Sequence, residues 1–276
     1  MKRLLLPFLL ASVAAAADIR TEHDVDYLGA GRAEKADLYL PAEVPPGQKF
    51  PAVLIIHGGG WIGGDKRAAR EINIGTTLAQ NGYVGMSINY LLAKADHPGP
   101  TWPQNLHDCK TAVRWLRANA ERLNIDPERI GVIGGSAGGH LAAMVGLTGP
   151  ELDPPGQGDC RVRCAVNLYG PVLWFEQRDL PMFRQTRAEA PELYRQADPR
   201  THVDKDDPPL LILHGTADKT VAVADSEALA AALKSVGAPH ELVIIPDAPH
   251  TFHLQPAQRD LRPLVLGFFD RYLKAK

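Results

Sequence analysis

The chain has 276 residues, of which 45% are hydrophobic and 22% are charged, and it contains 25 glycines and 23 prolines. This composition fits a folded globular domain and excludes a disordered chain, a coiled coil and collagen. The 30 Lys and Arg residues against 32 Asp and Glu residues give a formal net charge of -2. Since no excess positive charge is available to neutralise phosphates, nucleic acid is not an expected partner.

The first residues have the pattern of an export signal. Lys2 and Arg3 precede an apolar stretch from Leu4 to Ala17, which is 14 residues long and ends in small side chains. A helix that crosses a bilayer needs about 20 apolar residues, so this stretch is short for a membrane anchor. We therefore predict a signal peptide over residues 1–17, an exported periplasmic or extracellular protein without a stable membrane anchor, and a single domain over residues 18–276.

Strand and helix patterns alternate along the rest of the chain. The run 51–57 is apolar on both faces, which is typical of a strand buried within a sheet. We expect the other strands at residues 36–40, 83–90, 129–134, 165–169, 210–214 and 241–245. We expect helices at about 67–80, at 104–123, at 221–236 and from about 258. Repeated βαβ units predict an α/β fold with a mostly parallel central sheet flanked by helices.

The segment 171–207 shows no regular pattern and is too long for an ordinary connection. Long ordered loops in compact domains are often lids or binding loops, so we expect a small cap-like insertion here. Its Trp174 and Phe175 are candidates for contact with a substrate. Covering the edge of the core is the alternative role for these aromatic side chains.

Three cysteines are too few for a disulfide framework. Cys160 and Cys164 are close enough in sequence for a local bridge, but two unlinked thiols fit the sequence equally well. Cys109 lies among the apolar positions of a helical pattern, so we expect it to be buried rather than to act as a nucleophile.

A Gly-x-Ser-x-Gly motif lies between a predicted strand and a helix-forming stretch. Ser136 is its central residue, between Gly134 and Gly138. Glycines allow the sharp turn that exposes a serine hydroxyl at the end of a strand, beside the first turn of a helix. We therefore expect Ser136 to be a nucleophile.

A serine hydroxyl needs a base that accepts its proton and an acid that orients the base. Asp218 and His250 each follow a predicted strand, as Ser136 does, so all three belong to one edge of a parallel sheet. We predict Ser136, Asp218 and His250 as the catalytic residues. Asp247 and His253 are rival candidates on the same loop as His250.

Two further histidines accompany these candidates. His214 is expected to brace the turn before Asp218 through a hydrogen bond. His140, just inside the helix after Ser136, is expected to have a packing or capping role, with contact to the pocket as the alternative.

A glycine-rich loop follows the buried strand 51–57. It begins at His57 and continues through three glycines to Trp61. Backbone N–H groups in such a loop can stabilise the negative charge of a tetrahedral intermediate. We predict an oxyanion hole formed by Gly59, Gly60 and Ala137, with the N–H of Trp61 as a possible substitute. The Trp61 side chain is a third candidate for substrate contact, beside Trp174 and Phe175.

These segments together resemble the α/β-hydrolase fold. The strings 57–61 and 134–139 resemble its esterase and lipase branch, and the strings 61–66 and 136–142 are similar to those of exported bacterial esterases that remove acetyl or feruloyl groups from xylan. The resemblance implies a serine carboxylic-ester hydrolase that acts on short acyl or feruloyl esters of plant polysaccharide. The implied partner is a small-molecule or oligosaccharide ester, with no cofactor and no metal ion.

Other functions of this fold fit the same residues. An amidase or a prolyl-oligopeptidase-like serine peptidase uses the same catalytic residues, and only the pocket distinguishes the leaving groups. A binding module with a vestigial site is a further alternative, against which the complete set of serine, histidine and oxyanion loop argues.

Overall fold

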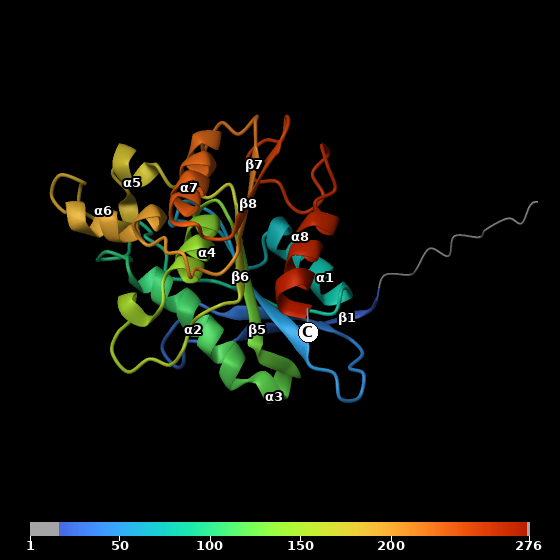
Figure 1. Ribbon diagram of the computed structural model, residues 1–276. Helices are drawn as coiled ribbons and strands as arrows, with labels where there is room; N and C mark the ends of the chain where they lie inside the picture. Colours follow the sequence, from blue (N-terminus) through green and yellow to red (C-terminus); the bar gives the residue numbers. More distant parts are fainter. Residues whose placement is uncertain (1–16, 275–276) are drawn as a thin grey trace, which may run out of the picture.

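The structure, a computed structural model, describes residues 17–274. Except for Ala17, the predicted signal peptide lies outside the described residues. Figure 1 shows a central twisted sheet with helices on both sides. No helix among residues 17–274 is long and apolar enough to cross a membrane.

Eight strands form one sheet in the order β1-β2-β4-β3-β5-β6-β7-β8. The first two strands are antiparallel to their neighbours, and every pair from β4 onward is parallel. The prediction of a mostly parallel sheet is thus confirmed. The strands are β1 (Ile19–Val25), β2 (Ala36–Pro41), β3 (Phe50–Ile56), β4 (Val84–Ile88), β5 (Ile125–Gly135), β6 (Cys164–Leu168), β7 (Leu210–Gly215) and β8 (His240–Ile245).

Helices cover both faces of the sheet (Figure 1). On one face lie α1 (Ala69–Gln80) and α8 (Arg262–Phe269), and on the other lie α2 (Gln104–Ala118), α4 (Ala137–Leu147) and α7 (Val223–Val236). Each face has its own cluster of buried apolar side chains. Burial on both faces explains why β3 is apolar throughout, since all seven of its residues are buried.

Several elements differ from those expected, and β5 begins at Ile125 rather than at 129. Strand β1 was not predicted, because its side chains are mostly polar and exposed and show no apolar alternation. It forms through pairing with β2 at the sheet edge. The predicted helix 104–123 is interrupted at Asn119, which separates α2 from α3 (Ala120–Leu123). The last helix begins at Arg262 rather than near 258, with a proline in its first turn, where the lack of an N–H costs little.

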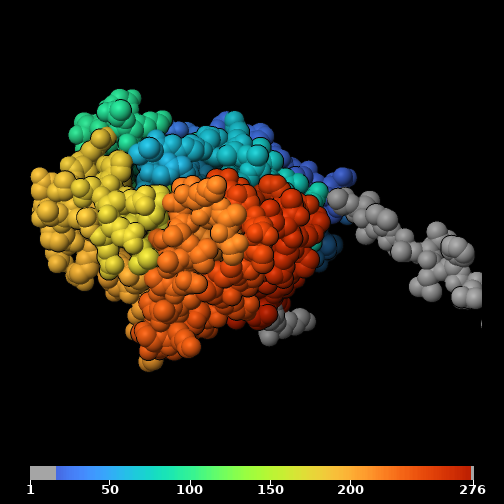
Figure 2. Space-filling model, turned by 90° about the horizontal axis from the view of Figure 1, so that it is seen from above, coloured from blue at the N-terminus to red at the C-terminus, as the bar shows by residue number. Residues whose placement is uncertain are grey.

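The segment 171–207 forms a compact insertion of short helices. It contains α5 (Trp174–Gln177), α6 (Pro191–Ala197) and two 3₁₀ turns. From above, its yellow to gold surface lies beside the green loop near residue 95 (Figure 2). Hydrogen bonds from Arg184 to the carbonyls of Lys94 and His97 join the insertion to this loop.

All three cysteines are buried free thiols. Of the two alternatives for Cys160 and Cys164, the structure therefore shows unlinked thiols. Cys109 is fully buried in α2, as its position in the helical pattern predicted. Burial raises the pKa of the Cys160 thiol to about 11, which keeps it neutral and unreactive.

Candidate active site

The turn between β5 and α4 holds Ser136 in a strained backbone conformation, with φ of 58° and ψ of -125°. The residues two positions before and two positions after it must be glycines. A Cβ atom on Gly134 would lie 2.2 Å from the carbonyl oxygen of Gly138, and a Cβ atom on Gly138 would lie 2.1 Å from that of Ile56. The turn thus presents the Ser136 hydroxyl at the carboxyl end of the sheet, as a nucleophile elbow does.

Ser136, His250 and Asp218 form one hydrogen-bonded chain. The Ser136 Oγ lies 3.0 Å from His250 Nε2, and His250 Nδ1 lies 2.6 Å from Asp218 Oδ2. The other carboxylate oxygen of Asp218 accepts the backbone N–H groups of Thr220 and Val221, at 2.8 Å and 2.9 Å. Since the Asp218 side chain is 0% exposed, these bonds hold its carboxylate without competition from water. The geometry suits proton transfer from a nucleophile to a fixed base.

The rival residues lie outside this chain. Asp247 is exposed, and its recorded contacts are through the backbone, to the Thr216 hydroxyl and to Gln258. His253 accepts the backbone N–H of Gln255 through its Nδ1. Neither side chain therefore contacts the hydrogen-bonded pair of Ser136 and His250.

His214 braces the loop that carries Asp218. Its ring is fully buried, its Nε2 lies 3.0 Å from the Val221 carbonyl oxygen and 3.3 Å from Asp218 Oδ2, and its Nδ1 lies 2.6 Å from the Ser226 hydroxyl. Burial lowers the pKa of His214, which favours the neutral ring. The bracing role expected from the sequence fits these contacts.

The glycine-rich loop lies against the nucleophile. A Cβ atom on Gly58 would lie 3.1 Å from the Ser136 Cβ atom. Gly59 and Gly60 adopt φ angles of 113° and 63°, which favour glycine. Ala137 is the first residue of α4, where the backbone N–H has no intrahelical partner. The three residues predicted for the oxyanion hole thus come from two segments that meet at Ser136.

A partly buried ion cluster anchors the far end of the glycine-rich loop. The Lys66 ammonium lies 2.8 Å from Asp24 and 2.9 Å from the fully buried Asp37. Although burial opposes it, hydrogen bonds from Arg67 and Lys66 hold the pKa of Asp37 well below its usual range. The carboxylate stays charged and fixes the segment that follows the glycines.

Arg70 and Tyr169 stand behind the catalytic residues. Arg70 donates to the Tyr169 hydroxyl at 3.0 Å, and that hydroxyl donates to the Phe252 carbonyl at 2.7 Å. The Tyr169 ring packs edge-on against His250, with centroids 4.8 Å apart. Sequence reasoning missed both residues, because no local pattern links the start of α1 to the residue that follows β6.

A cavity of about 500 Å³ opens over the site. Among the residues that line it are Gly59, Gly60, Ser136, Trp174, Thr220 and His250. Of the three aromatic residues predicted to contact substrate, only Trp174 lies on this surface.

Trp61 and Phe175 are buried instead, with 1% and 3% of their surface exposed. Their ring centroids lie 5.9 Å apart, and both rings pack against His140. The structure does not place them as substrate contacts, because both rings pack with His140 in the core and neither lines the cavity. His140 is buried beside them. Its Nε2 lies 2.8 Å from the carbonyl oxygen of Ala197, a residue that does not line the cavity.

Within residues 17–274, no group of three or more His, Cys, Asp or Glu side chains is arranged to hold a metal ion. Ser136, His250 and Asp218 are hydrogen-bonded in series, an arrangement able to activate a hydroxyl beside the glycine-rich loop.

Comparison with known proteins points to esterases. A family model described as BD-FAE matches residues 36–233. Esterase LipQ of Mycobacterium tuberculosis is 30% identical over 250 residues, which cover 86% of this chain and 58% of LipQ. The chain thus spans little more than half the length of this relative.

Two solved structures match over nearly their whole length. A truncated carbohydrate esterase from gut microbiota has a TM-score of 0.80 and 26% identity, covering 94% of this chain and 98% of that protein. The butyrate-bound esterase Est2 of Thermogutta terrifontis has a TM-score of 0.75 and 26% identity, covering 95% of this chain and 96% of that one. The chain therefore belongs to the BD-FAE family and shares the α/β-hydrolase fold of these carboxylic ester hydrolases.

Proposed function

We propose that this protein is a serine carboxylic-ester hydrolase whose nucleophile is Ser136. The observation that carries the proposal is the continuous hydrogen-bonded chain from Ser136 Oγ through His250 to the buried Asp218. A neutral imidazole in this position can accept the serine proton, and the carboxylate behind it fixes the ring orientation and stabilises the imidazolium that forms.

The reaction follows from this geometry. Ser136 Oγ attacks the ester carbonyl carbon while its proton passes to His250 Nε2, and the carbonyl oxygen becomes an oxyanion facing the N–H groups of Gly59, Gly60 and Ala137. The carbon–oxygen bond to the alcohol then breaks, and the alcohol oxygen takes the proton from His250. Water hydrolyses the acyl-enzyme by the same sequence, with His250 again as base, and Ser136 is regenerated.

Short acyl or feruloyl esters of plant polysaccharide are the substrates we propose. The resemblance of the strings 61–66 and 136–142 to acetylxylan and feruloyl esterases supports this class, as does the carbohydrate esterase among the structural neighbours. The wall of Ala68, Ala69 and Trp174 in the 500 Å³ cavity offers apolar contact for an acyl group.

Release of acetate from acetylated xylo-oligosaccharides and of ferulate from a feruloylated arabinoxylan fragment tests the proposal, beside p-nitrophenyl acetate and an amide analogue. We expect hydrolysis of the carbohydrate esters that disappears in Ser136→Ala. Hydrolysis of p-nitrophenyl acetate alone would contradict the polysaccharide substrate. Cleavage of the amide in preference to every ester would contradict the esterase.

We also propose that the protein acts outside the cytoplasm, supported by the basic and apolar pattern of residues 1–17. Sequencing the N-terminus of the protein recovered from its native host should give Asp18 as the first residue. A retained Met1 would contradict cleavage.

A further inference from the structure

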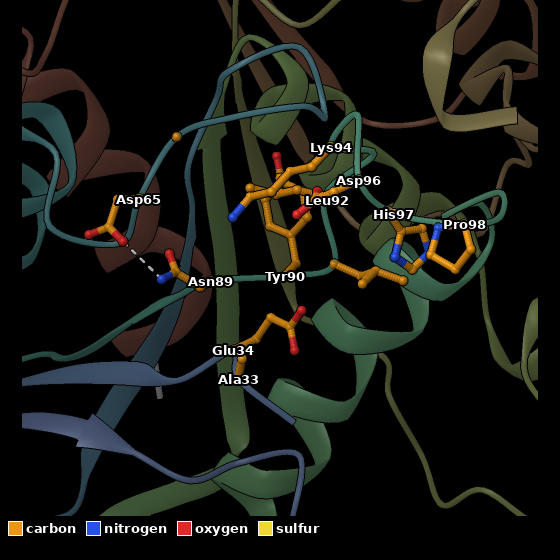
Figure 3. Close-up of a pocket in the computed structure, with 12 residues that line it drawn as sticks. Ala33, Glu34, Asp65, Asn89, Tyr90, Leu92, Lys94, Asp96, His97 and Pro98 are labelled. Atoms are coloured by element: carbon orange, nitrogen blue, oxygen red, sulfur yellow. Dashed lines mark hydrogen bonds between the residues drawn. The ribbon is translucent and has the colours of Figure 1, made fainter. Parts of the chain in front are cut away.

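A second cavity, of about 340 Å³, adjoins the catalytic cavity. Gly64 and Asp65 line both cavities, so the segment after the glycine-rich loop forms a wall that the two cavities share. Figure 3 shows Glu34 on one side of the second cavity and Lys94 and Asp96 on the other. Its volume falls at the lower end of the range for small-molecule sites, about 300–1,000 Å³.

The walls of this cavity carry hydrogen-bonding groups of both kinds. Glu34, Asp65 and Asp96 contribute three carboxylates, and Lys94 contributes one ammonium group. The Glu34 side chain is 17% exposed, and Arg32 donates to its Oε2 at 2.8 Å. Sugar hydroxyls both donate and accept, so carboxylates together with an ammonium group suit them. Arg32 beside Glu34 and Arg184 beside the 94–97 loop offset much of the carboxylate charge, which suits a neutral ligand.

Both sides of the cavity are fixed by contacts elsewhere in the fold. Arg32, which holds Glu34, also pairs at 2.6 Å with the buried Asp108, and Asp108 accepts the backbone N–H of Leu91 at 2.9 Å. On the opposite side, Arg184 of the insertion donates to the carbonyl oxygens of Lys94 and His97 at 2.6 Å and 3.1 Å. The Glu34 carboxylate and the backbone of the 94–97 loop are therefore held in place before a ligand arrives.

We infer that this second cavity binds the alcohol part of the substrate, a neutral glycosyl unit next to the acylated sugar position. The inference rests on the proposed esterase function. An ester carbonyl at Ser136 has two substituents, and the apolar wall formed by Ala68, Ala69 and Trp174 suits the acyl group. The polar cavity beyond Gly64 and Asp65 then receives the alcohol. Glu34 and Asp96 are the residues that select it.

The test compares two esters that share an acetyl group, acetylated xylo-oligosaccharide and p-nitrophenyl acetate. The variants are Glu34→Gln, which keeps the shape of the side chain, and Asp96→Asn on the exposed loop. Glu22→Gln is the matched control, since Glu22 is also a partly buried glutamate paired with arginine, on β1. We expect each cavity variant to lower kcat/KM for the oligosaccharide about 10-fold, mainly through KM, and to change it less than twofold for p-nitrophenyl acetate.

The outcomes separate the two proposals. Equal changes on both esters, or no change on either, would overturn the alcohol site while leaving the esterase intact. Absence of Ser136-dependent hydrolysis of both esters in the unmodified protein would overturn the esterase and the alcohol site with it.

Discussion

The corner that holds Ser136 and the insertion over residues 171–207 place their functional side chains by different means. At the corner, a short turn after a strand and a few hydrogen bonds fix each polar group, so chain position alone brings Ser136, Asp218 and His250 to one edge. In the insertion, packing of neighbouring rings decides which aromatic side chain meets the cavity. Trp174 faces it, whereas the next residue, Phe175, is buried. The positions of the polar catalytic groups could therefore be predicted from the sequence, whereas the orientation of the aromatic side chains could not.

The largest expected effect comes from the corner. Asp218→Ala removes the carboxylate that orients His250 and should lower kcat about 10³- to 10⁴-fold. Asp247→Ala removes an exposed acid of the neighbouring loop and should change kcat less than about threefold, in steady-state assays with p-nitrophenyl acetate at equal folded fractions. If the two variants exchanged these effects, the acid would be wrongly assigned.

In the insertion, the expected effect is on stability. Phe175→Ala empties space among Trp61, His140 and Phe183 and should lower the free energy of unfolding by about 3 kcal/mol. Urea unfolding measures this loss, and Phe175→Leu should recover most of it. Below the unfolding transition, kcat with p-nitrophenyl acetate should stay within about threefold of the unmodified protein. A stable Phe175→Ala variant that had lost its activity would place the ring at the substrate after all.

The buried histidines predict how stability depends on pH. Burial lowers the pKa of His57 and of His140 to about 4 each, from 6.5. Between these values the unfolded chain binds protons that the folded chain does not, so the free energy of unfolding falls as the pH drops through this window. In His140→Gln, the fall measured by urea unfolding between pH 7 and pH 4.5 should be smaller by about 2 kcal/mol. The partly exposed His240 offers a control in His240→Gln. An unchanged pH dependence in His140→Gln would show that His140 titrates normally.

The smallest effect is expected at Trp174, the one aromatic residue of the three at the cavity. Trp174→Ala should raise KM for a feruloyl ester about 10-fold and leave kcat within about threefold, because the ring contacts the acyl group in the ground state and transition state alike. KM for the small acetyl ester should change less. A loss confined to kcat would instead mean that Trp174 holds the catalytic groups in place.

The limits of the sequence prediction have physical causes. Strand β3 and the second half of β5 could be recognised because burial on both faces makes them apolar. The Gly-x-Ser-x-Gly turn could be recognised because a side chain at either outer glycine would clash with the backbone. Strand β1 could not, since polar, mostly exposed residues form it by pairing at the sheet edge. Arg70 and Tyr169 gave no signal either, because their contact joins segments almost 100 positions apart.

The contacts around the site also differ in how well the sequence predicts them. His214 could be assigned a bracing role because it lies near the end of β7, only four positions before Asp218. The orientation of Trp61 could not be assigned, since its neighbours Phe175 and His140 come from distant segments. Contacts between residues close in sequence could thus be predicted, whereas packing between distant segments could be established only from the structure.

Covalent labelling of Ser136 tests the central claim most directly. The protein would be treated with an aryl phosphonate ester that carries a good leaving group, and the intact mass and the modified peptide would be determined. We predict one adduct per chain on Ser136, complete loss of ester hydrolysis, and labelling at least about 10³-fold slower in His250→Ala, which lacks the base. An adduct on another residue, or full hydrolytic activity after Ser136 is modified, would contradict the account.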